Sequence, residues 1–431
     1  MAHSLFGFVA LYTAVFILLT GVGLLGTFLS LRMSIEGFSE QVTGMVMSVY
    51  YVGTVLGCFY CHRVICRVGH IRAFATFAAV CTASVMAHGL FISPVSWGGL
   101  RLLTGIAVTG LYMVVESWLN AGADRSNRGR IISVYMVVSF LGLGSGQFLL
   151  NAGEVNGPHL FLVTGSLLAL CLVPVSTTHS VQPQVPETLH FNLVALWRTA
   201  PMGMFGCLTA GLINGALYTL GPVFGHLIGL AVPGISLFMG TTVLSGLILQ
   251  WPVGLLSDRF DRNIVMAGLG LAVAAISLAI TLLMRESFSL LLTLTILYGG
   301  VAFTLYPVAV AHTHDFFPPD DIVAVSSALI LSYGVGASLG PLAAAMMMNF
   351  LGPSGLYVFI ALAGSIFGGT VAVYRRRRPE RLEVVYPVSF MAMRTSSPVV
   401  AVLDPRSEAQ PAPDGPSVLD APAHKPTRSP P

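Results

Sequence analysis

Long apolar stretches recur along the whole chain and are separated by short polar or Gly- and Pro-containing segments. Each stretch reaches the about 20 residues that an α-helix needs to cross the hydrocarbon core of a bilayer. Because no water is available there, a crossing segment must bond its backbone groups internally as a helix. The pattern predicts an all-α membrane protein with twelve transmembrane helices. The predicted spans are residues 8–31, 43–62, 73–92, 99–119, 131–151, 158–177, 203–225, 234–255, 264–283, 288–310, 323–348 and 355–374.

The arginines between these spans predict the orientation. If both termini are cytoplasmic (N-in/C-in), fourteen arginines lie in cytoplasmic segments, and only Arg32 and Arg285 lie on the other side. Basic residues accumulate in the cytoplasmic loops of membrane proteins. We therefore expect a multi-pass membrane protein with the N-in/C-in arrangement.

The longest internal loop, residues 178–202, divides the spans into an N-terminal bundle of six, 1–177, and a C-terminal bundle of six, 203–378. The two halves share short matches at one spacing, such as Gly105–Tyr112 with Gly299–Tyr306. Parallel repeats of this kind form transporters that rock around a central site. Residues 379–431 are expected to be a cytoplasmic tail, largely disordered from about residue 395 because it is rich in Pro, Ser, Ala and Asp.

Composition excludes several classes of protein. Only 9% of residues are charged, against about 25% in soluble domains. No basic patch with interleaved aromatics is present, so nucleic acid is not expected as a partner. Cys58-Phe-Tyr-Cys61-His62 matches the attachment pattern of a c-type haem, but it falls at the cytoplasmic end of the second span, where thiols stay reduced. We expect no cofactor and no metal.

A stretch after the eighth predicted span, Gly254-Leu-Leu-Ser-Asp258-Arg259-Phe-Asp261-Arg262, resembles the G-x-L-x-D-R-x-G-R signature of the major facilitator superfamily. Asp261 stands in place of the second glycine. The corresponding first-half segment keeps Arg67 but has Cys66 in place of the aspartate. The resemblance covers roughly residues 5–378, and it implies the fold of this superfamily.

Further segments resemble the bacterial YcaD-like branch of that superfamily. They are Val114-Val-Glu-Ser117, Ser126-Asn-Arg-Gly-Arg130, Gln250-Trp-Pro-Val-Gly254, Phe303-Thr-Leu-Tyr-Pro307 and Leu331–Pro341. This finer resemblance implies a multi-pass protein of the bacterial inner (plasma) membrane, and it names no transported solute.

Two strongly charged side chains, Arg101 and Glu116, lie within the predicted spans, both in the fourth. At 1.5 Å per residue they are about 22 Å apart along the helix, so they do not pair with each other. Arg101-Leu-Leu-Thr-Gly105 resembles the R-x-x-x-G of the family's fourth helix, which is associated with proton coupling. The alternative is that Arg101 extends to the external headgroups. Glu116 is expected to be a gate residue or a proton carrier.

The family resemblance implies a cavity lined by the first, fourth, seventh and tenth helices. Aromatic walls with few charges suit a partly apolar, weakly charged or anionic solute. Asn214 has the alternative role of bonding between helices. The expected cavity and coupling residues are Arg101, Tyr112, Asn214, Tyr218 and Tyr306.

A cytoplasmic gate is expected from the charges of loops that meet in the family fold. The loop between the second and third spans carries arginines and no acid, whereas the loop after the tenth carries aspartates and no Lys or Arg. Asp258 is expected near the N-terminus of the fifth helix, where the helix dipole favours an anion. The gate residues are Glu116, Arg67, Arg128, Arg130, Asp258, Arg259, Arg262 and Asp315.

Small residues on the fifth and eleventh spans indicate close helix packing. The fifth partly resembles the G-x-x-x-G-P signature of the family's antiporters, with Gln147 in place of the proline, which favours export. The packing residues are Gly142, Gly144, Gly146, Gly336, Gly340 and Pro341.

These patterns predict a secondary active transporter, and no enzyme. It would move a small organic solute across the membrane by alternating access, coupled to protons, with export favoured, and it would act as a monomer. The chain has no G-x-x-x-x-G-K-[ST] loop for nucleotide. One alternative is a receptor or scaffold on the same frame, with the tail as the contact segment. Another is a membrane redox enzyme, which would require clustered ligands within the bilayer.

Overall fold

The computed structural model describes residues 2–123, 127–176, 193–377 and 386–404. Eleven segments of these residues are long and apolar enough to cross a membrane, and the last, Pro319–Arg377, contains two helices. Each of the twelve predicted spans is therefore matched by helical structure. The transmembrane segments are α1 (Ala2–Ile35), α2 (Glu40–Val68), α3 (His70–His88), α4 (Pro94–Ala121), α5 (Arg128–Phe148), α6 (His159–Leu170) with α7 (Leu172–Ser176), α9 (Pro201–Leu227), α10 (Val232–Arg259), α11 (Arg262–Leu283), α12 (Phe288–His314), α13 (Ile322–Leu351) and α14 (Gly355–Arg377).

The helix boundaries follow from local chemistry. Ser39 and Ser287 precede α2 and α12, and their hydroxyls accept backbone N–H bonds from Val42 and Leu290, which satisfies donors that a helix start leaves open. Helix α2 runs six residues beyond its predicted end and stops at Gly69, whose φ of 83° favours glycine. Arg63 and Arg67 in the last turns of α2 are exposed.

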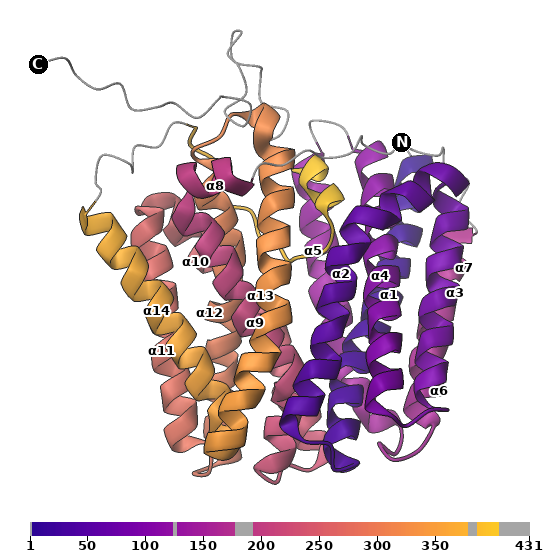
Figure 1. Ribbon diagram of the computed structural model, residues 1–431. Helices are drawn as coiled ribbons and strands as arrows, with labels where there is room; N and C mark the ends of the chain where they lie inside the picture. Colours follow the sequence, from indigo (N-terminus) through magenta and orange to yellow (C-terminus); the bar gives the residue numbers. More distant parts are fainter. Residues whose placement is uncertain (1, 124–126, 177–192, 378–385, 405–431) are drawn as a thin grey trace, which may run out of the picture.

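The helices form two bundles, α1–α7 and α9–α14, which lie side by side in Figure 1. Helix α1 begins and α14 ends at the same face, at the top of the figure, which we call the terminus face. The opposite one is the far face. The short helix α8 (Leu193–Thr199) lies at the terminus face just before α9. The predicted fold of two six-helix bundles is confirmed.

The two bundles meet directly on the far-face side of the molecule. Ser236 near the start of α10 donates to the backbone oxygen of Gln147 on α5 and accepts from Asn151, both at 2.9 Å. Gly44 near the start of α2 packs so tightly on α13 that an added Cβ would lie 2.8 Å from the oxygen of Pro341. Helices α2 and α13, α5 and α10, and α1 and α9 are neighbours across the two bundles.

A C-terminal segment, residues 386–404, occupies the terminus-face side between the bundles. Its last part is a 3-10 helix, η5 (Pro398–Leu403), which packs against α4, α5 and α13 and is the yellow helix beside α13 in Figure 1. Disorder is expected from about residue 395, but residues 395–404 are packed into the molecule. Pro398–Leu403 is apolar, and its burial compensates for the cost of ordering. The rest of the tail, 405–431, lies outside the described residues.

Candidate functional site

A cavity of about 180 Å³ lies between the two bundles. Its wall is mostly aromatic and apolar, with few polar groups, and no acidic side chain among the described residues lines it. The five residues expected at the cavity, Arg101, Tyr112, Asn214, Tyr218 and Tyr306, all line it. Sequence positions as distant as 101 and 306 thus contribute to one site.

Helix α4 carries Arg101 and Tyr112 into the cavity, because it packs closely on α2. A Cβ at Gly105 would collide with the backbone oxygen of Tyr50, so only glycine permits this approach. The approach places the Arg101 guanidinium 4.3 Å from the centre of the Tyr50 ring, a cation–π contact. Arg101 is only 5% exposed, and its Nε has no hydrogen-bond partner among the described residues. Arg101 is therefore buried in the cavity wall, and its Nε–H donor is accepted by none of the described residues.

The second bundle supplies an aromatic wall opposite α4. Tyr218 on α9 lies 5.5 Å from Phe303 on α12, and Tyr306 lies 5.3 Å from Tyr333 on α13, both measured between ring centres. Asn214, one turn before Tyr218, is 4% exposed. The wall combines flat apolar faces with hydroxyl and amide groups, which is typical of small-molecule sites.

Glu116 lies one turn beyond Tyr112 on α4 and is fully buried. Its carboxylate accepts a hydrogen bond of 2.8 Å from the Tyr135 hydroxyl on α5 and another from the Ser397 hydroxyl of the C-terminal segment. The two roles expected for Glu116, gate residue and proton carrier, stay predictions. Among the described residues its partners are hydroxyl groups, so in this conformation the contacts of Glu116 are to α5 and the tail.

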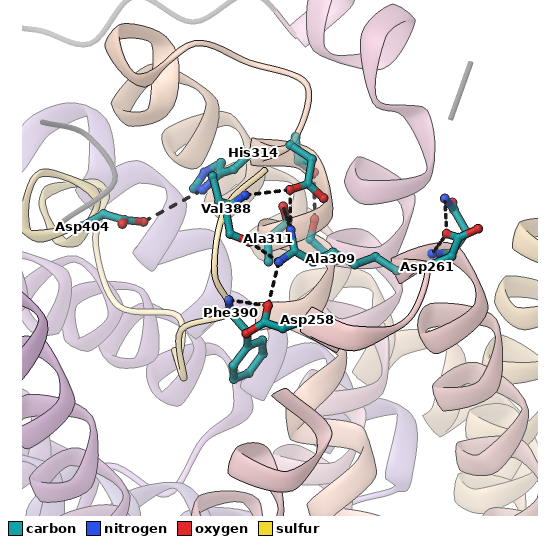
Figure 2. Close-up of polar contacts among 12 residues, drawn as sticks. Asp258, Asp261, Ala309, Ala311, His314, Val388, Phe390 and Asp404 are labelled. Carbon is teal, nitrogen blue, oxygen red and sulfur yellow. Dashed lines mark hydrogen bonds and ion pairs between the residues drawn. The ribbon is translucent and has the colours of Figure 1, made fainter. Parts of the chain in front are cut away.

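Arg262 is the centre of a charge cluster at the terminus face of the second bundle. Its guanidinium donates to Asp315 at 2.5 Å, to Asp258 at 3.0 Å and to the backbone oxygen of Ala311 at 3.0 Å. These three of the expected gate residues therefore meet within one bundle. Asp258 and Asp315 are also bonded by the C-terminal segment, as Figure 2 shows for Phe390 and Val388.

The other expected gate residues lie apart from this cluster. Arg67, Arg130 and Arg259 are exposed, and no ion pair joins them to an acid elsewhere in the described part of the chain. Arg128 at the start of α5 donates to the backbone oxygen of Val402 at 3.0 Å. In this conformation the C-terminal segment contacts charged groups of both bundles, and the expected direct pairs between the bundles are not formed by the described residues.

The small residues of α5 and α13 lie where helices approach closely. A Cβ added to Gly142 would lie 2.9 Å from the backbone oxygen of Phe16 on α1, and one on Gly144 would meet Leu244 on α10. A Cβ on the other glycines would meet backbone atoms of a neighbouring helix; these are Gly146, which faces α1, and Gly336 and Gly340, which face α9.

Sequence reasoning missed the part of the cavity wall made by the C-terminal segment. Met393, Arg394, Thr395 and Ser396 line the cavity together with Tyr50 and Gln147. The available signal was two apolar runs, VVYPVSFMAM and PVVAVL, in a tail that is otherwise polar. Within the described residues, no group of three or more His, Cys, Asp or Glu side chains is arranged to hold a metal.

Comparison with known proteins places these features in a family. Residues 11–282 and 225–403 match the model of the Major Facilitator Superfamily. An uncharacterized MFS-type transporter, YcaD, of Salmonella heidelberg is 32% identical over 357 residues, which cover 81% of this chain and 91% of the relative. The YcaD protein of Salmonella typhi is 32% identical over 356 residues with the same coverage.

Solved structures share the fold at low sequence identity. A bacterial homologue of the human lysosomal transporter Spinster, in an inward-facing and occupied conformation, matches with a TM-score of 0.71 and 14% identity, covering 88% of this chain and 98% of that one. The nucleoside transporter NupG matches with a TM-score of 0.70 and 15% identity, covering 88% and 99%.

Proposed function

The chain belongs to the major facilitator superfamily of transporters, and we propose that it is a proton-coupled secondary transporter of small organic anions. It would work as a monomer in the bacterial inner membrane, with both termini in the cytoplasm, and it would export its solute. The monomer is supported by a cavity that a single chain completes. Export rests on the glycine pattern of α5 alone.

One observation carries the substrate class. The cavity contains the buried guanidinium of Arg101, whose Nε lacks a partner among the described residues, and no acid from those residues lines the wall. A buried donor without a partner is costly. A carboxylate or phosphate group on a solute would satisfy it with a charge-assisted bond. The tyrosine walls favour an apolar or aromatic body next to that group.

Proton coupling is supported by Glu116, an acid buried on the same helix. Ionisable groups inside a membrane are costly and usually functional. Binding or release of a proton there would change the charge next to the cavity, and Tyr135 and Ser397 would have to adjust their hydrogen bonds. Asp258 and Asp315, now bound to Arg262, are proposed to pair with the first bundle when the terminus face closes.

The test begins with a metabolite and drug-sensitivity screen of a deletion strain against a complemented strain. Anionic hits are then measured as flux into proteoliposomes, with and without an imposed pH gradient. Losing a hydrogen bond to a charged group costs about 1.5–3 kcal/mol, so Arg101→Ala should raise the half-saturating concentration by about 10- to 100-fold. Arg285→Ala removes an exposed arginine between α11 and α12 and should transport normally.

Two results would count against the proposal. Equal flux in the Arg101→Ala and Arg285→Ala proteins would show that Arg101 does not bind the anionic group of the solute. Uptake that ignores the pH gradient in the wild-type protein would contradict the coupling to protons.

A further inference from the structure

The C-terminal segment is attached to the second bundle by backbone hydrogen bonds. Tyr386 N–H donates to the backbone oxygen of Asp315 at 2.8 Å, and Val388 N–H donates to the carboxylate of the same residue at 3.2 Å. Phe390 N–H donates to Asp258 at 2.8 Å. Figure 2 shows this extended stretch beside α10 and α12. Asp258 and Asp315 thus accept hydrogen bonds from the backbone N–H groups of three alternate residues of one extended segment.

The middle of the segment contacts the first bundle and enters the cavity. Arg394 donates to the Tyr112 hydroxyl at 3.0 Å, and its guanidinium lies 5.0 Å from the centre of the Tyr112 ring. Three residues later, Ser397 donates to the Glu116 carboxylate. An aromatic face, a hydroxyl and a nearby carboxylate together form a site for a guanidinium. Arg394 occupies that site.

The end of the segment is packed between the bundles. Val400 and Leu403 of η5 are 2% and 0% exposed, and η5 touches α4 and α5 of one bundle and α13 of the other. Arg128 holds the backbone oxygen of Val402 at 3.0 Å. The Asp404 carboxylate lies 3.9 Å from Nδ1 of His314 at the end of α12. Both bundles therefore contact the segment at the terminus face.

From these contacts we propose that residues 386–404 are a built-in blocking segment. It occupies the terminus-face side of the cavity with Arg394 in the guanidinium site, and it competes with the transported solute. The cavity that remains, about 180 Å³, is smaller than the about 300–1,000 Å³ of small-molecule sites. A tethered competitor acts at a high effective concentration, so weak individual contacts suffice.

The blocking segment also opposes the change of conformation. The bundles touch directly on the far-face side, whereas at the terminus face η5 fills the space between them. For the bundles to close at the terminus face, the segment must leave. Its release is therefore a step that precedes each transport cycle, and any partner that binds the released segment would activate the protein.

The test uses Cys58, which lines the cavity. Cys66 is exposed and is replaced by serine, while the other four cysteines are buried. Maleimide labelling of Cys58 in detergent is compared between the full chain, a chain ending at residue 385 and a chain ending at residue 404. The labelling rate follows the fraction of undocked molecules, so ending the chain at 385 should raise it about tenfold or more. Ending at 404 should leave it unchanged.

If the chain ending at residue 385 folds poorly, a full-length variant tests the same proposal. Arg394→Glu places a carboxylate beside Glu116, and like charges repel, so the segment should undock and labelling should rise. Arg406→Glu makes the same charge change beyond the blocking segment and should have no effect. A synthetic peptide of residues 386–404 should protect Cys58 in the chain that ends at 385, and the peptide with Arg394→Ala should protect it less.

The proposal is overturned if Cys58 labels equally fast in the full chain, in Arg394→Glu and in a monodisperse chain ending at 385. It is also overturned if the peptide gives no protection to that chain. None of these measurements needs a transported solute. Their failure would leave the proposed transport function intact, and absence of transport would leave the labelling result intact.

Discussion

Asp261 occupies a position where the family signature has glycine, and the structure shows what it does there. Its carboxylate caps α11 by accepting the Asn263 N–H at 2.8 Å, and it accepts a second bond from Arg375 Nε at 2.7 Å. Partial burial acts to raise the pKa of this carboxyl, but the bonds from Arg375 and Asn263 outweigh it, so the pKa lies below its usual value. The ionised form is the stabilising one.

We predict that Asp261→Ala lowers the free energy of unfolding in detergent by about 0.5–2 kcal/mol, the usual cost of losing an N-cap. Asp261→Asn should cost less, because asparagine also caps and the exposed pair with Arg375 contributes only about 0–1 kcal/mol. Because the folded pKa is lowered, the contribution of the charge is present above the unfolded value of 3.8. It is lost as pH falls through the folded pKa.

Thermal unfolding at several pH values checks this prediction. The difference between wild type and Asp261→Ala should shrink as the pH is lowered below the usual carboxyl pKa. A difference that stays constant between neutral and strongly acidic pH would show that the charge of Asp261 contributes nothing.

At the residue scale, the five residues expected at the cavity all line it, but the sequence did not indicate the partners of these residues. Arg101 stands out from the sequence because a charge inside an apolar span is costly. The contact of Tyr112 with Arg394 joins positions 282 residues apart, and no periodicity in the sequence relates them. The same holds for Glu116 and Ser397. Such contacts depend on the tertiary structure, which brings the C-terminal segment back to α4.

At the scale of helices, the glycines divide into those that a neighbour covers and those that face open space. A Cβ on Gly336 in α13 would collide with the backbone oxygen of Leu208 on α9, whereas a Cβ on Gly369 in α14 would meet nothing within 4 Å. Small residues allow transmembrane helices to approach this closely. We therefore expect the two positions to respond differently to the same substitution.

We predict that Gly336→Ala lowers the melting temperature in detergent, because overpacking costs about 1–3 kcal/mol. Gly369→Ala should leave it unchanged or raise it, since replacing an uncovered helical glycine by alanine gains about 0.5–1 kcal/mol. Melting curves of the two variants decide the matter. Equal losses in both would mean that the close approach of α9 and α13 does not determine the response at Gly336.

At the scale of the whole molecule, the contacts on the far-face side fix the relative position of the bundles. The Ser236 hydroxyl joins α10 to Gln147 and Asn151 of the first bundle. Ser245, on the same helix, donates within its own helix to Thr242 at 2.8 Å. Both hydroxyls are buried, but only that of Ser236 depends on the conformation of the two bundles.

We predict that Ser236→Ala shifts the population toward a conformation that is open at the far face. A hydrogen bond contributes about 1 kcal/mol, so the ratio of the two conformations should change about fivefold. Distances between spin labels on the far-face ends of the two bundles measure the ratio, and Ser245→Ala is the matched control. If the two variants give the same distance distribution, the bond across the bundles does not bias the equilibrium.

The sequence by itself determined the number, the helical nature and the approximate limits of the spans. It did so because a bilayer admits only long apolar helices, so composition and length decide. It also showed that Arg101 and Glu116 are strongly charged side chains within the predicted spans. The tertiary structure decided the rest: the meeting of Arg262 with Asp258 and Asp315, and the return of residues 386–404 into the cavity. The composition of the tail predicts disorder from about residue 395, and only the space left between the bundles makes the burial of residues 386–404 favourable.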